Sequence, residues 1–388
     1  MNNRRMWATA GALAVGLSLA PALQASASAS DSGLPSRGGL RSGAVFVQLN
    51  GGDGNSIAAY SRGADGSLTP VGRFATGGRG GKEIGAPVDA LASQGGLAAA
   101  DDGRVLVAVN AGSGTVSTLR VGEHGLQRIG TVSSRGDFPS SVTVRGSRVY
   151  VLDSGGTGTV SGYRLDDGRL RPIAGAVASL GLANAPVPAF ITAPAQIGLS
   201  PDGRTLVVTT KANNTIVTFP VRRDGTLGSA VVTASQGPVP FSFVFDRAGR
   251  LQVQQAGDGR NASYAVNADS SLTPLGVSAP SGGAALCWSV RIGRFLFGVN
   301  AGSGTITSWR LAHDGTSTIA EAVAGSAAGG LIDIAASRGG RFVYALNAVA
   351  GTVSVFANDR DGGLTPAGSV GGLPTIDAAG GPEGIVAT

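Results

Sequence analysis

The chain is organised by a short pattern of apolar and polar positions that recurs along its length. Val105–Val116 combines an apolar run with Asn110 and a glycine turn, and Phe295–Ile306 repeats this arrangement almost letter for letter. Short runs of branched apolar residues bounded by glycine are typical of buried β-strands. The pattern therefore predicts pairs of strands joined by glycine-containing turns.

The same pattern occurs seven times. Its aligned positions are 50, 110, 154, 211, 256, 300 and 347, so the intervals are 60, 44, 57, 45, 44 and 47 residues. A repeat of about 45 residues suits a four-stranded propeller blade, and two intervals carry insertions. Seven copies therefore predict an all-β, seven-bladed β-propeller with four strands in each blade.

The two ends of the repeat region predict how the ring closes. Ala44–Leu49 matches the second strand of a blade, whereas Gly384–Ala387 matches a first strand. The C-terminal strand should therefore complete blade 1 and leave no free strand edge. The propeller is expected to cover residues 43–388, with blades at about 44–78 plus 383–388, 96–134, 140–178, 195–234, 240–278, 284–324 and 330–370.

The N-terminus has the three parts of a cleavable secretory signal. Arg4 and Arg5 precede the apolar run Ala8–Leu23, and small residues follow up to Ala29. The run is shorter than the roughly 20 apolar residues of a membrane span. We therefore predict a signal peptide at residues 1–29, a flexible segment at residues 30–42, and a secreted protein, extracellular or periplasmic, that has no membrane partner.

Composition excludes several classes of function. The 388 residues include 64 glycines, one cysteine and two histidines, His124 and His313. One thiol and two histidines, both in turns, provide neither a disulfide framework nor a metal cluster, so no metal or cofactor is expected. The formal charge of +6 comes mainly from arginines scattered singly at turns. Nucleic-acid binding is therefore not expected, because such proteins cluster their basic residues among aromatic ones.

Candidate site residues lie where the second strands end and the first strands begin. Loops between the second and third strands, and between blades, share one end of the ring, and the two longest are Thr76–Gly95 and Gly175–Ala193. Long loops on a rigid scaffold often carry function. The candidate catalytic residues are Lys211, Glu383 and Asp333, and the candidate binding residues are Asn50, Asn110, Asp153, Gln196, Asn300, Asn347 and Trp288.

Each candidate also has a structural interpretation. The repeated asparagines can serve the local backbone, because asparagine bonds nearby main-chain groups and tolerates turn geometry. Lys211 stands where sister repeats have asparagine, and it could pair with a buried carboxylate or bind an anion. Cys287, next to Trp288, is expected in the core, since no histidine is placed to activate the thiol.

These repeats resemble the seven-bladed lactonase propeller family, which includes 6-phosphogluconolactonase and carboxymuconate cyclase. The resemblance rests on Val45–Asn50, Asp65–Pro70, Pro201–Arg204 and Gly384–Val386, and it covers nearly the whole chain after the signal. It is closer to the exported members through Thr76–Gly80, Ser93–Gly96, Lys211–Ile216 and Cys287–Trp288. It implies a lactonase-type ester hydrolase or a cycloisomerase.

The family's catalytic motif is incomplete in this chain. Pro194–Gln196 and Thr210–Lys211 stand where phosphogluconolactonase-like members have Pro-Arg-His and Asn-Glu, and Pro139–Ser141 replaces a further histidine. Hydrolysis of a lactone needs a base for water and a charge for the oxyanion. Glu383 or Asp333 as base, with Lys211 as partner, would supply both by a different arrangement.

Three hypotheses follow. The first is an exported enzyme that hydrolyses or forms a lactone of a small hydroxy or sugar acid at the channel mouth. The second is a non-catalytic propeller that binds a small molecule, a glycan or a protein through its two long loops. The third is a structural envelope protein. A closed ring with no free edge favours a monomer in all three cases.

Overall fold

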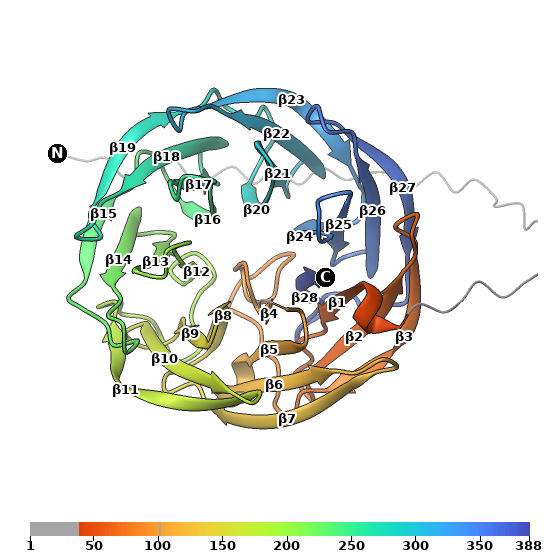
Figure 1. The fold of residues 1–388 in the computed structure, drawn as a ribbon, viewed down its shortest axis with the longest axis horizontal. Helices are drawn as coiled ribbons and strands as arrows, with labels where there is room; N and C mark the ends of the chain where they lie inside the picture. Colours follow the sequence, from red (N-terminus) through yellow and green to blue (C-terminus); the bar gives the residue numbers. More distant parts are fainter. Residues whose placement is uncertain (1–38, 101) are drawn as a thin grey trace, which may run out of the picture. The chain divides into compact units, whose positions relative to one another are not determined.

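The computed structural model describes residues 39–388 apart from residue 101. The described residues belong to one compact unit. In it, seven four-stranded antiparallel sheets are arranged in a ring (Figure 1). The predicted all-β, seven-bladed propeller is thereby confirmed. The predicted signal peptide at residues 1–29 lies outside the described residues.

The blades follow one another around the ring in chain order. Blade 1 consists of β28 (Glu383–Ala387), β1 (Ala44–Gln48), β2 (Ser56–Arg62) and β3 (Leu68–Ala75), and blade 2 of β4 (Leu97–Ala99), β5 (Val105–Asn110), β6 (Thr115–Val121) and β7 (Leu126–Ser133). Blade 3 consists of β8 (Pro139–Arg145), β9 (Arg148–Asp153), β10 (Thr159–Asp166) and β11 (Arg169–Ser179), and blade 4 of β12 (Pro194–Leu199), β13 (Thr205–Thr210), β14 (Thr215–Pro220) and β15 (Val231–Ala234). Blade 5 consists of β16 (Pro240–Phe245), β17 (Leu251–Gln255), β18 (Arg260–Val266) and β19 (Leu272–Val277). Blade 6 consists of β20 (Leu286–Ile292), β21 (Phe295–Asn300), β22 (Thr305–Leu311) and β23 (Ser317–Ser326), and blade 7 of β24 (Leu331–Ala336), β25 (Phe342–Asn347), β26 (Thr352–Asn358) and β27 (Leu364–Val370).

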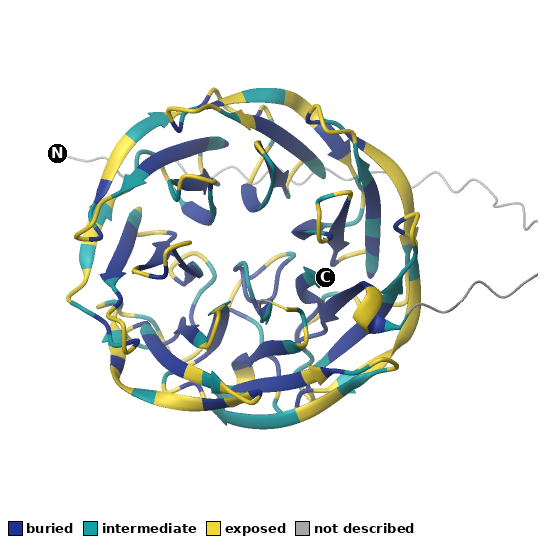
Figure 2. Cartoon of the chain, viewed as in Figure 1, coloured by how far each residue is buried: buried dark blue, intermediate teal, exposed yellow. Residues whose placement is uncertain are grey.

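Burial decreases from the second strand of each blade to the fourth. Every residue of β13, β21 and β25 is buried, whereas most of β3 and β27 is exposed (Figure 2). The second strands are covered on both faces by neighbouring blades, so most of them carry apolar runs; β17, which is buried and includes three glutamines, is the exception. The fourth strands form the outer rim, and there polar residues alternate with apolar ones.

The C-terminal strand closes the ring. β28 pairs antiparallel with β1, with Val386 opposite Phe46 and Ile385 opposite Val47. The first blade is therefore built from both ends of the propeller, as the sequence predicted. Because β1 would otherwise be an open edge, this pairing satisfies its backbone donors and acceptors.

Glycine is required where turns of one blade touch the next. Gly66 lies in the turn between β2 and β3 with φ +87°, a conformation that side chains rarely adopt. A Cβ there would collide with the ring of Phe342 in blade 7, and the Tyr344 hydroxyl donates to the Gly66 carbonyl at 3.1 Å. The turn therefore locks blade 1 onto blade 7.

The first described residues are ordered against blade 2. Leu40–Ser42 form the short 3-10 helix η1, and a second, η2, spans Ala111–Ser113. Leu40 is 1% exposed and its N–H donates to the Glu123 carbonyl at 2.9 Å. In the described part of the chain, no helix is long and apolar enough to cross a membrane.

The two long inter-blade loops contact each other. They span residues 76–96, between β3 and β4, and residues 180–193, between β11 and β12. The second loop begins later than residue 175 because β11 continues to Ser179. Ile84 forms a parallel bridge with Ala189, and its N–H donates to the Pro188 carbonyl at 2.9 Å. Both insertions therefore cover the same end of the ring.

Candidate functional site

Part of the first long loop enters the ring and closes one end of the central channel. We call residues 89–95 the plug. Leu91 and Ser93 within it have no exposed surface. The Ser93 hydroxyl donates to the Ser140 carbonyl of β8 at 2.9 Å, and the Trp288 indole N–H of β20 donates to the Ser93 carbonyl at 2.8 Å. Trp288, a predicted binding residue, thus holds the plug.

The side chain and backbone of Gln94 fix the plug to two further points. Its amide nitrogen donates to the Ser289 carbonyl at 2.8 Å, and its amide oxygen accepts from the Ser289 N–H at 3.1 Å. The Gln94 N–H also donates to the Ala195 carbonyl of β12 at 2.9 Å. We expected an open ligand mouth at this end of the ring. The centre of that end is instead occupied by the chain's own backbone.

Lys211 lies beneath the plug and is 2% exposed. Its ammonium donates to the Ala92 carbonyl at 2.7 Å and lies 3.6 Å from the Glu83 Oε2. It also stands 5.5 Å from the centroid of the Phe241 ring, within reach of a cation–π interaction. Of the two roles left open by the sequence, this geometry gives Lys211 a buried carboxylate partner.

Glu83 was not singled out from the sequence. Burial raises the pKa of its carboxyl well above the usual value, Lys211 opposes that shift, and Asp89 reinforces it. Neither Glu83 oxygen has a hydrogen-bond donor among the described residues, since 3.6 Å is an ion-pair distance only. The sequence signal that could have found it is that Glu83 and Asp89 are the only acids in a loop made mostly of glycine and small or apolar residues.

Asp89 and Glu383 form a buried carboxyl pair against the plug backbone. Asp89 accepts the N–H groups of Leu91 at 3.0 Å and Ser93 at 3.1 Å. Glu383 Oε2 also accepts from Leu91, at 3.3 Å. Burial raises the pKa of both carboxyls, and the hydrogen bond between them raises that of Glu383 further. One proton held between the two carboxyls satisfies this arrangement.

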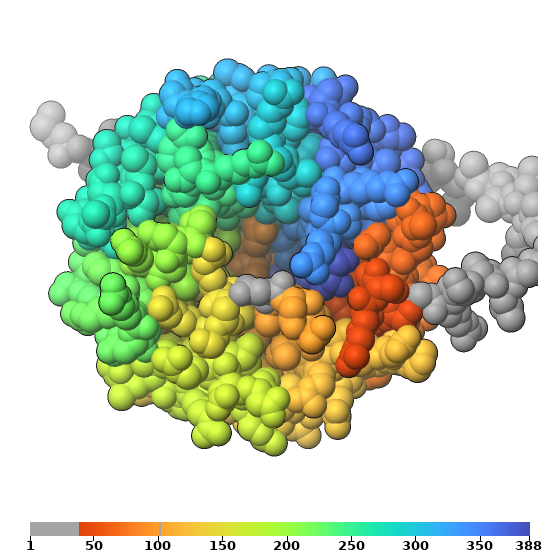
Figure 3. Space-filling model, in the orientation of Figure 1, coloured from red at the N-terminus to blue at the C-terminus, as the bar shows by residue number. Residues whose placement is uncertain are grey.

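Asp333 is the candidate catalytic residue that lines a cavity. The cavity has a volume of about 310 Å³. It is lined by the first strands of blades 2 to 5 (β4, β8, β12 and β16), by Gln94 of the plug, and by Asp333 and Ile385. Figure 3 shows a hollow at the centre of the ring, with the orange-brown of the loop before β4 at its floor. Burial raises the pKa of Asp333 to about 7, although its oxygens accept the N–H groups of Ile334 at 2.8 Å and Ile385 at 3.1 Å. A carboxyl with such a pKa can exchange protons near neutral pH.

Gln196 reaches the same cavity but its amide is already used. Its amide oxygen accepts the Phe243 N–H at 2.7 Å, and its amide nitrogen donates to the Phe243 carbonyl at 3.1 Å. This two-bond contact joins β12 to β16 across adjacent blades. Gln94 joins the plug to β20 in the same way. Both glutamines therefore shape the cavity wall.

The repeated asparagines make local contacts at the ends of the second strands. Asn110, Asn300 and Asn347 each donate to two hydroxyls of the following strand: Thr115 and Ser117, Thr305 and Thr307, and Thr352 and Ser354. Asn50 instead binds Gly81 of the first long loop through both its amide nitrogen and oxygen. All four are fully buried. The structural interpretation that the sequence left open accounts for these contacts.

Asp153 is a buried carboxylate of a different kind. It has no exposed surface, and neither of its oxygens accepts a hydrogen bond among the described residues. Burial raises the pKa of Asp153 well above the usual value, the nearby Ser134 hydroxyl opposes the shift, and the neighbouring Asp137 adds to it. Asp153 is therefore most stable as the neutral acid.

Other titratable side chains lie away from the cavity chemistry. His124 and His313 are exposed in turns between third and fourth strands, as predicted. Cys287 is buried and its pKa is raised to about 12 by burial, so the thiol remains protonated at neutral pH. Among the residues that the structure describes, no group of three His, Cys, Asp or Glu side chains is placed to hold a metal ion.

Comparisons with known proteins give one match to a family model and several solved structures with a similar fold. Residues 157–270, in blades 3 to 5, match the model of the lactonase, 7-bladed beta-propeller family. The periplasmic gluconolactonase of Pseudomonas aeruginosa is 23% identical with a TM-score of 0.65, over 86% of this chain and 98% of its own. A putative 6-phosphogluconolactonase of Bacteroides fragilis is 17% identical with a TM-score of 0.66, over 92% and 100%. A protein of Lactobacillus plantarum is 17% identical with a TM-score of 0.69, over 89% and 99%. No curated protein matches this sequence.

At these identities the solved structures establish the shared fold. The family match is independent of them, because it rests on the sequence of blades 3 to 5. The resemblance predicted from the repeats is confirmed: the chain resembles the seven-bladed lactonase propellers in the sequence of its middle blades and in the fold of its ring.

Proposed function

We propose that the protein hydrolyses a small lactone in the central cavity, with Asp333 as the general base. The observation that carries the proposal is a buried carboxyl with a pKa of about 7 on the wall of a cavity of about 310 Å³. Ligand sites of small molecules begin at about this size. The match to the lactonase propellers supplies the reaction class.

The reaction requires one water molecule and one base. The Asp333 carboxylate takes a proton from water as the water oxygen attacks the lactone carbonyl. The ring ester bond then breaks, and the proton passes to the departing alkoxide, which gives a hydroxy acid. A base whose pKa lies near the working pH combines a useful ionised fraction with a sufficient driving force for proton transfer.

Asp89, Lys211 and Glu383 support Asp333 and the cavity wall without meeting the substrate. Asp89, which is hydrogen-bonded to Glu383, raises the pKa of Asp333 through its negative charge. Lys211 binds the plug through the Ala92 carbonyl, and the plug supplies Gln94 to the cavity wall. We therefore assign Lys211 and Glu383 as positioning residues, and Asp333 as the residue that meets the substrate.

The test is proton release from a panel of sugar, aliphatic and muconate lactones by the purified protein. Asp333→Asn should abolish turnover, because an amide cannot accept the proton. Asp153→Asn makes the same chemical change at a buried carboxyl of blade 3 that does not line the cavity, and this variant should retain turnover. Full turnover by Asp333→Asn would refute the assignment.

A second candidate function, binding without turnover, is favoured by one observation. The cavity lining contains no lysine, arginine or histidine, and the amides of Gln94 and Gln196 are both engaged by the backbone. An oxyanion would then have to be stabilised by other donors. Calorimetry separates the two functions, since a hydroxy acid or lactone that binds in the cavity without proton release supports binding alone.

We further propose that the protein acts after export. The signal-like residues 1–29 and the likeness to a periplasmic gluconolactonase support this proposal. Mass spectrometry of the protein from the producing cell should give an N-terminus near residue 30. An intact Met1 in a protein confined to the cytoplasm would contradict export.

A further inference from the structure

Arginines that are scattered in the sequence gather around one cavity at the other end of the ring. The cavity has a volume of about 970 Å³ and lies among turns of blades 5, 6 and 7. Its lining includes six arginines: Arg247, Arg291, Arg294, Arg338, Arg341 and Arg360. No aspartate or glutamate belongs to that lining. The structure thus creates a concentrated positive charge that the spacing along the chain did not reveal.

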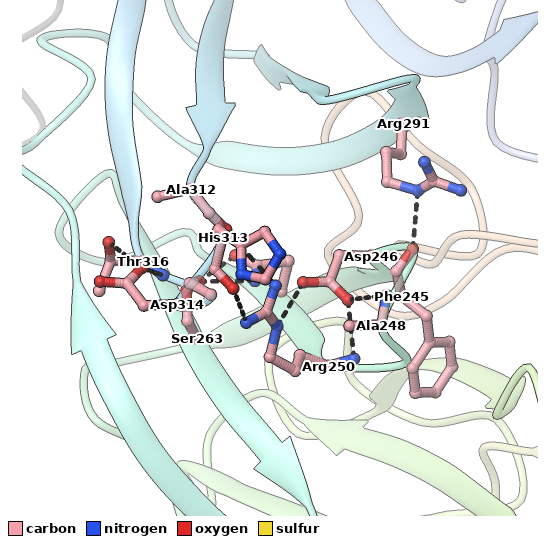
Figure 4. A network of polar contacts seen from close by, with 12 residues as sticks. Phe245, Asp246, Ala248, Arg250, Ser263, Arg291, Ala312, His313, Asp314 and Thr316 are labelled. Carbon is pink, nitrogen blue, oxygen red and sulfur yellow. Dashed lines mark hydrogen bonds and ion pairs between the residues drawn. The ribbon is translucent and has the colours of Figure 1, made fainter.

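Among the described residues, the positive charge of these arginines is offset only in part, because the charge of Asp246 acts on Arg291. None of the six takes part in a recorded ion pair. Asp246 lies next to Arg247 in the chain, yet its carboxylate binds the Arg250 Nε at 2.6 Å (Figure 4). Arg250 in turn donates to the His313 carbonyl at 2.7 Å. The one carboxylate in this turn is therefore committed to a different arginine.

Several of the arginines are held in place without losing their charge. Arg291 donates through Nε to the Phe245 carbonyl at 2.8 Å, which Figure 4 shows, and through one terminal nitrogen to the Gly293 carbonyl at 2.6 Å. Arg294 lies 5.5 Å from the centroid of the Phe295 ring, and Arg341 lies 5.3 Å from that of Phe342. Such contacts restrict the side chains and leave donor atoms available to a ligand.

The electrostatics of Arg291 reflect the same excess of positive charge. Burial lowers the pKa of its guanidinium, the nearby charge of Arg247 lowers it further, and the charge of Asp246 opposes the shift. An anion placed between them would remove this repulsion. The guanidinium fork matches the oxygens of phosphate and carboxylate groups, so multivalent anions are the ligands that fit such a lining.

We propose that this arginine-lined cavity binds a small organic or inorganic polyphosphate. Its volume falls within the range of about 300–1,000 Å³ that is typical of small-molecule sites, which favours a compact ligand over a polymer. A terminal phosphate carries a charge of about −1.5 to −2 at neutral pH and an internal one about −1, so a tripolyphosphate supplies about four to five negative charges against six guanidinium groups. A ligand that carries carboxylates would need about six of them in the same space to balance the six guanidinium charges, because each carboxylate carries one negative charge.

The experiment is calorimetric titration of the folded protein with tripolyphosphate at low salt, with citrate as the carboxylate arm. We expect one tripolyphosphate to bind per chain, more tightly than citrate, and added salt to weaken the binding. The variant Arg338→Gln/Arg360→Gln removes two exposed guanidinium groups that have no recorded side-chain partner. It should weaken binding by at least tenfold, about the effect of losing one charge-assisted contact.

The matched control is Arg145→Gln/Arg223→Gln, which removes two exposed arginines from blades 3 and 4. It lowers the net charge equally, so it should retain the wild-type affinity if the site is local. Equal weakening by both variants would show a general charge effect and overturn the proposal. Absence of tripolyphosphate binding, or citrate binding at least as tightly, would overturn it as well.

Discussion

The buried pair of Lys211 and Glu83 gives a sharp test of how the plug is held. Lys211→Met keeps the length of the side chain but removes its charge, and it leaves Glu83 without its ion-pair partner. Breaking a fully buried ion pair from one side costs about 3–5 kcal/mol. Because the pKa of Glu83 is already raised, its carboxyl can become neutral at lower cost, so we expect the lower part of that range.

The second variant in this test is Lys211→Met/Glu83→Gln. It removes the orphaned charge but still leaves the Ala92 carbonyl without its donor, which costs about 1–3 kcal/mol. The double variant should therefore be more stable than Lys211→Met by about 2 kcal/mol at pH 7. Urea unfolding of both variants and of the wild type measures these differences.

The sign of the pH dependence follows from the raised pKa of Glu83. In Lys211→Met the folded state holds the Glu83 proton more tightly than the unfolded state, so stability falls as pH rises above the unfolded pKa of 4.5. The gap between single and double variants should therefore be smaller at pH 5 than at pH 7. A loss below about 1 kcal/mol in Lys211→Met, or a double variant no more stable than the single one, would refute the reasoning.

Three further predictions concern the ring itself. Deleting residues 382–388 removes β28 and exposes the edge of β1, so the melting temperature should fall by several degrees in calorimetry, and an unchanged value would contradict ring closure. Gly80→Ala would place a Cβ against the Asn50 carbonyl, and urea unfolding should show a loss of about 1–3 kcal/mol, whereas unchanged stability would mean that the loop can shift. Asp153→Asn removes a buried carboxylate that accepts no hydrogen bond. It should therefore raise the free energy of unfolding by about 1–3 kcal/mol at pH 7 and by less at pH 5. A loss of stability at both pH values would count against the raised pKa.

The fold could be predicted because each blade repeats the same pattern of apolar, polar and glycine positions. The apolar run, the polar residue and the glycine turn recur at nearly constant spacing, so seven weak signals reinforce one another. The C-terminal strand was predictable for the same reason, since Gly384–Ala387 has a partner only if it returns to blade 1. Repetition thus supplied the long-range pairing that a single sequence rarely reveals.

The plug could not be predicted, because it depends on where an irregular loop lies in space. The contacts of Ser93 with Ser140 and of Gln94 with Ser289 join residues 47 and 195 positions apart. No periodicity encodes such pairs. The sequence predicted either an ion pair or an anion site for Lys211. Its partner Glu83 could not be predicted, because it lies in a loop outside the repeat pattern.

The arginine-lined cavity was missed for a related reason. Arg247, Arg294 and Arg341 occupy equivalent turns in consecutive blades, about one repeat apart, and therefore appear isolated in the sequence. The ring brings these turns side by side. Charge clustering in a repeat protein should thus be counted at equal positions of successive repeats as well as along the chain.

The most direct test of the central claim is the pH dependence of lactone hydrolysis by the wild type and by Asp333→Asn, after subtraction of the spontaneous reaction. A general base must be ionised in the free enzyme, so kcat/KM of the wild type should rise with pH and level off above the Asp333 pKa of about 7. The Asp333→Asn variant should show no enzymatic rate at any pH. A wild-type rate without that inflection, or one that Asp333→Asn retains, would contradict the proposed role of Asp333, and the absence of turnover of every lactone would contradict the enzymatic function itself.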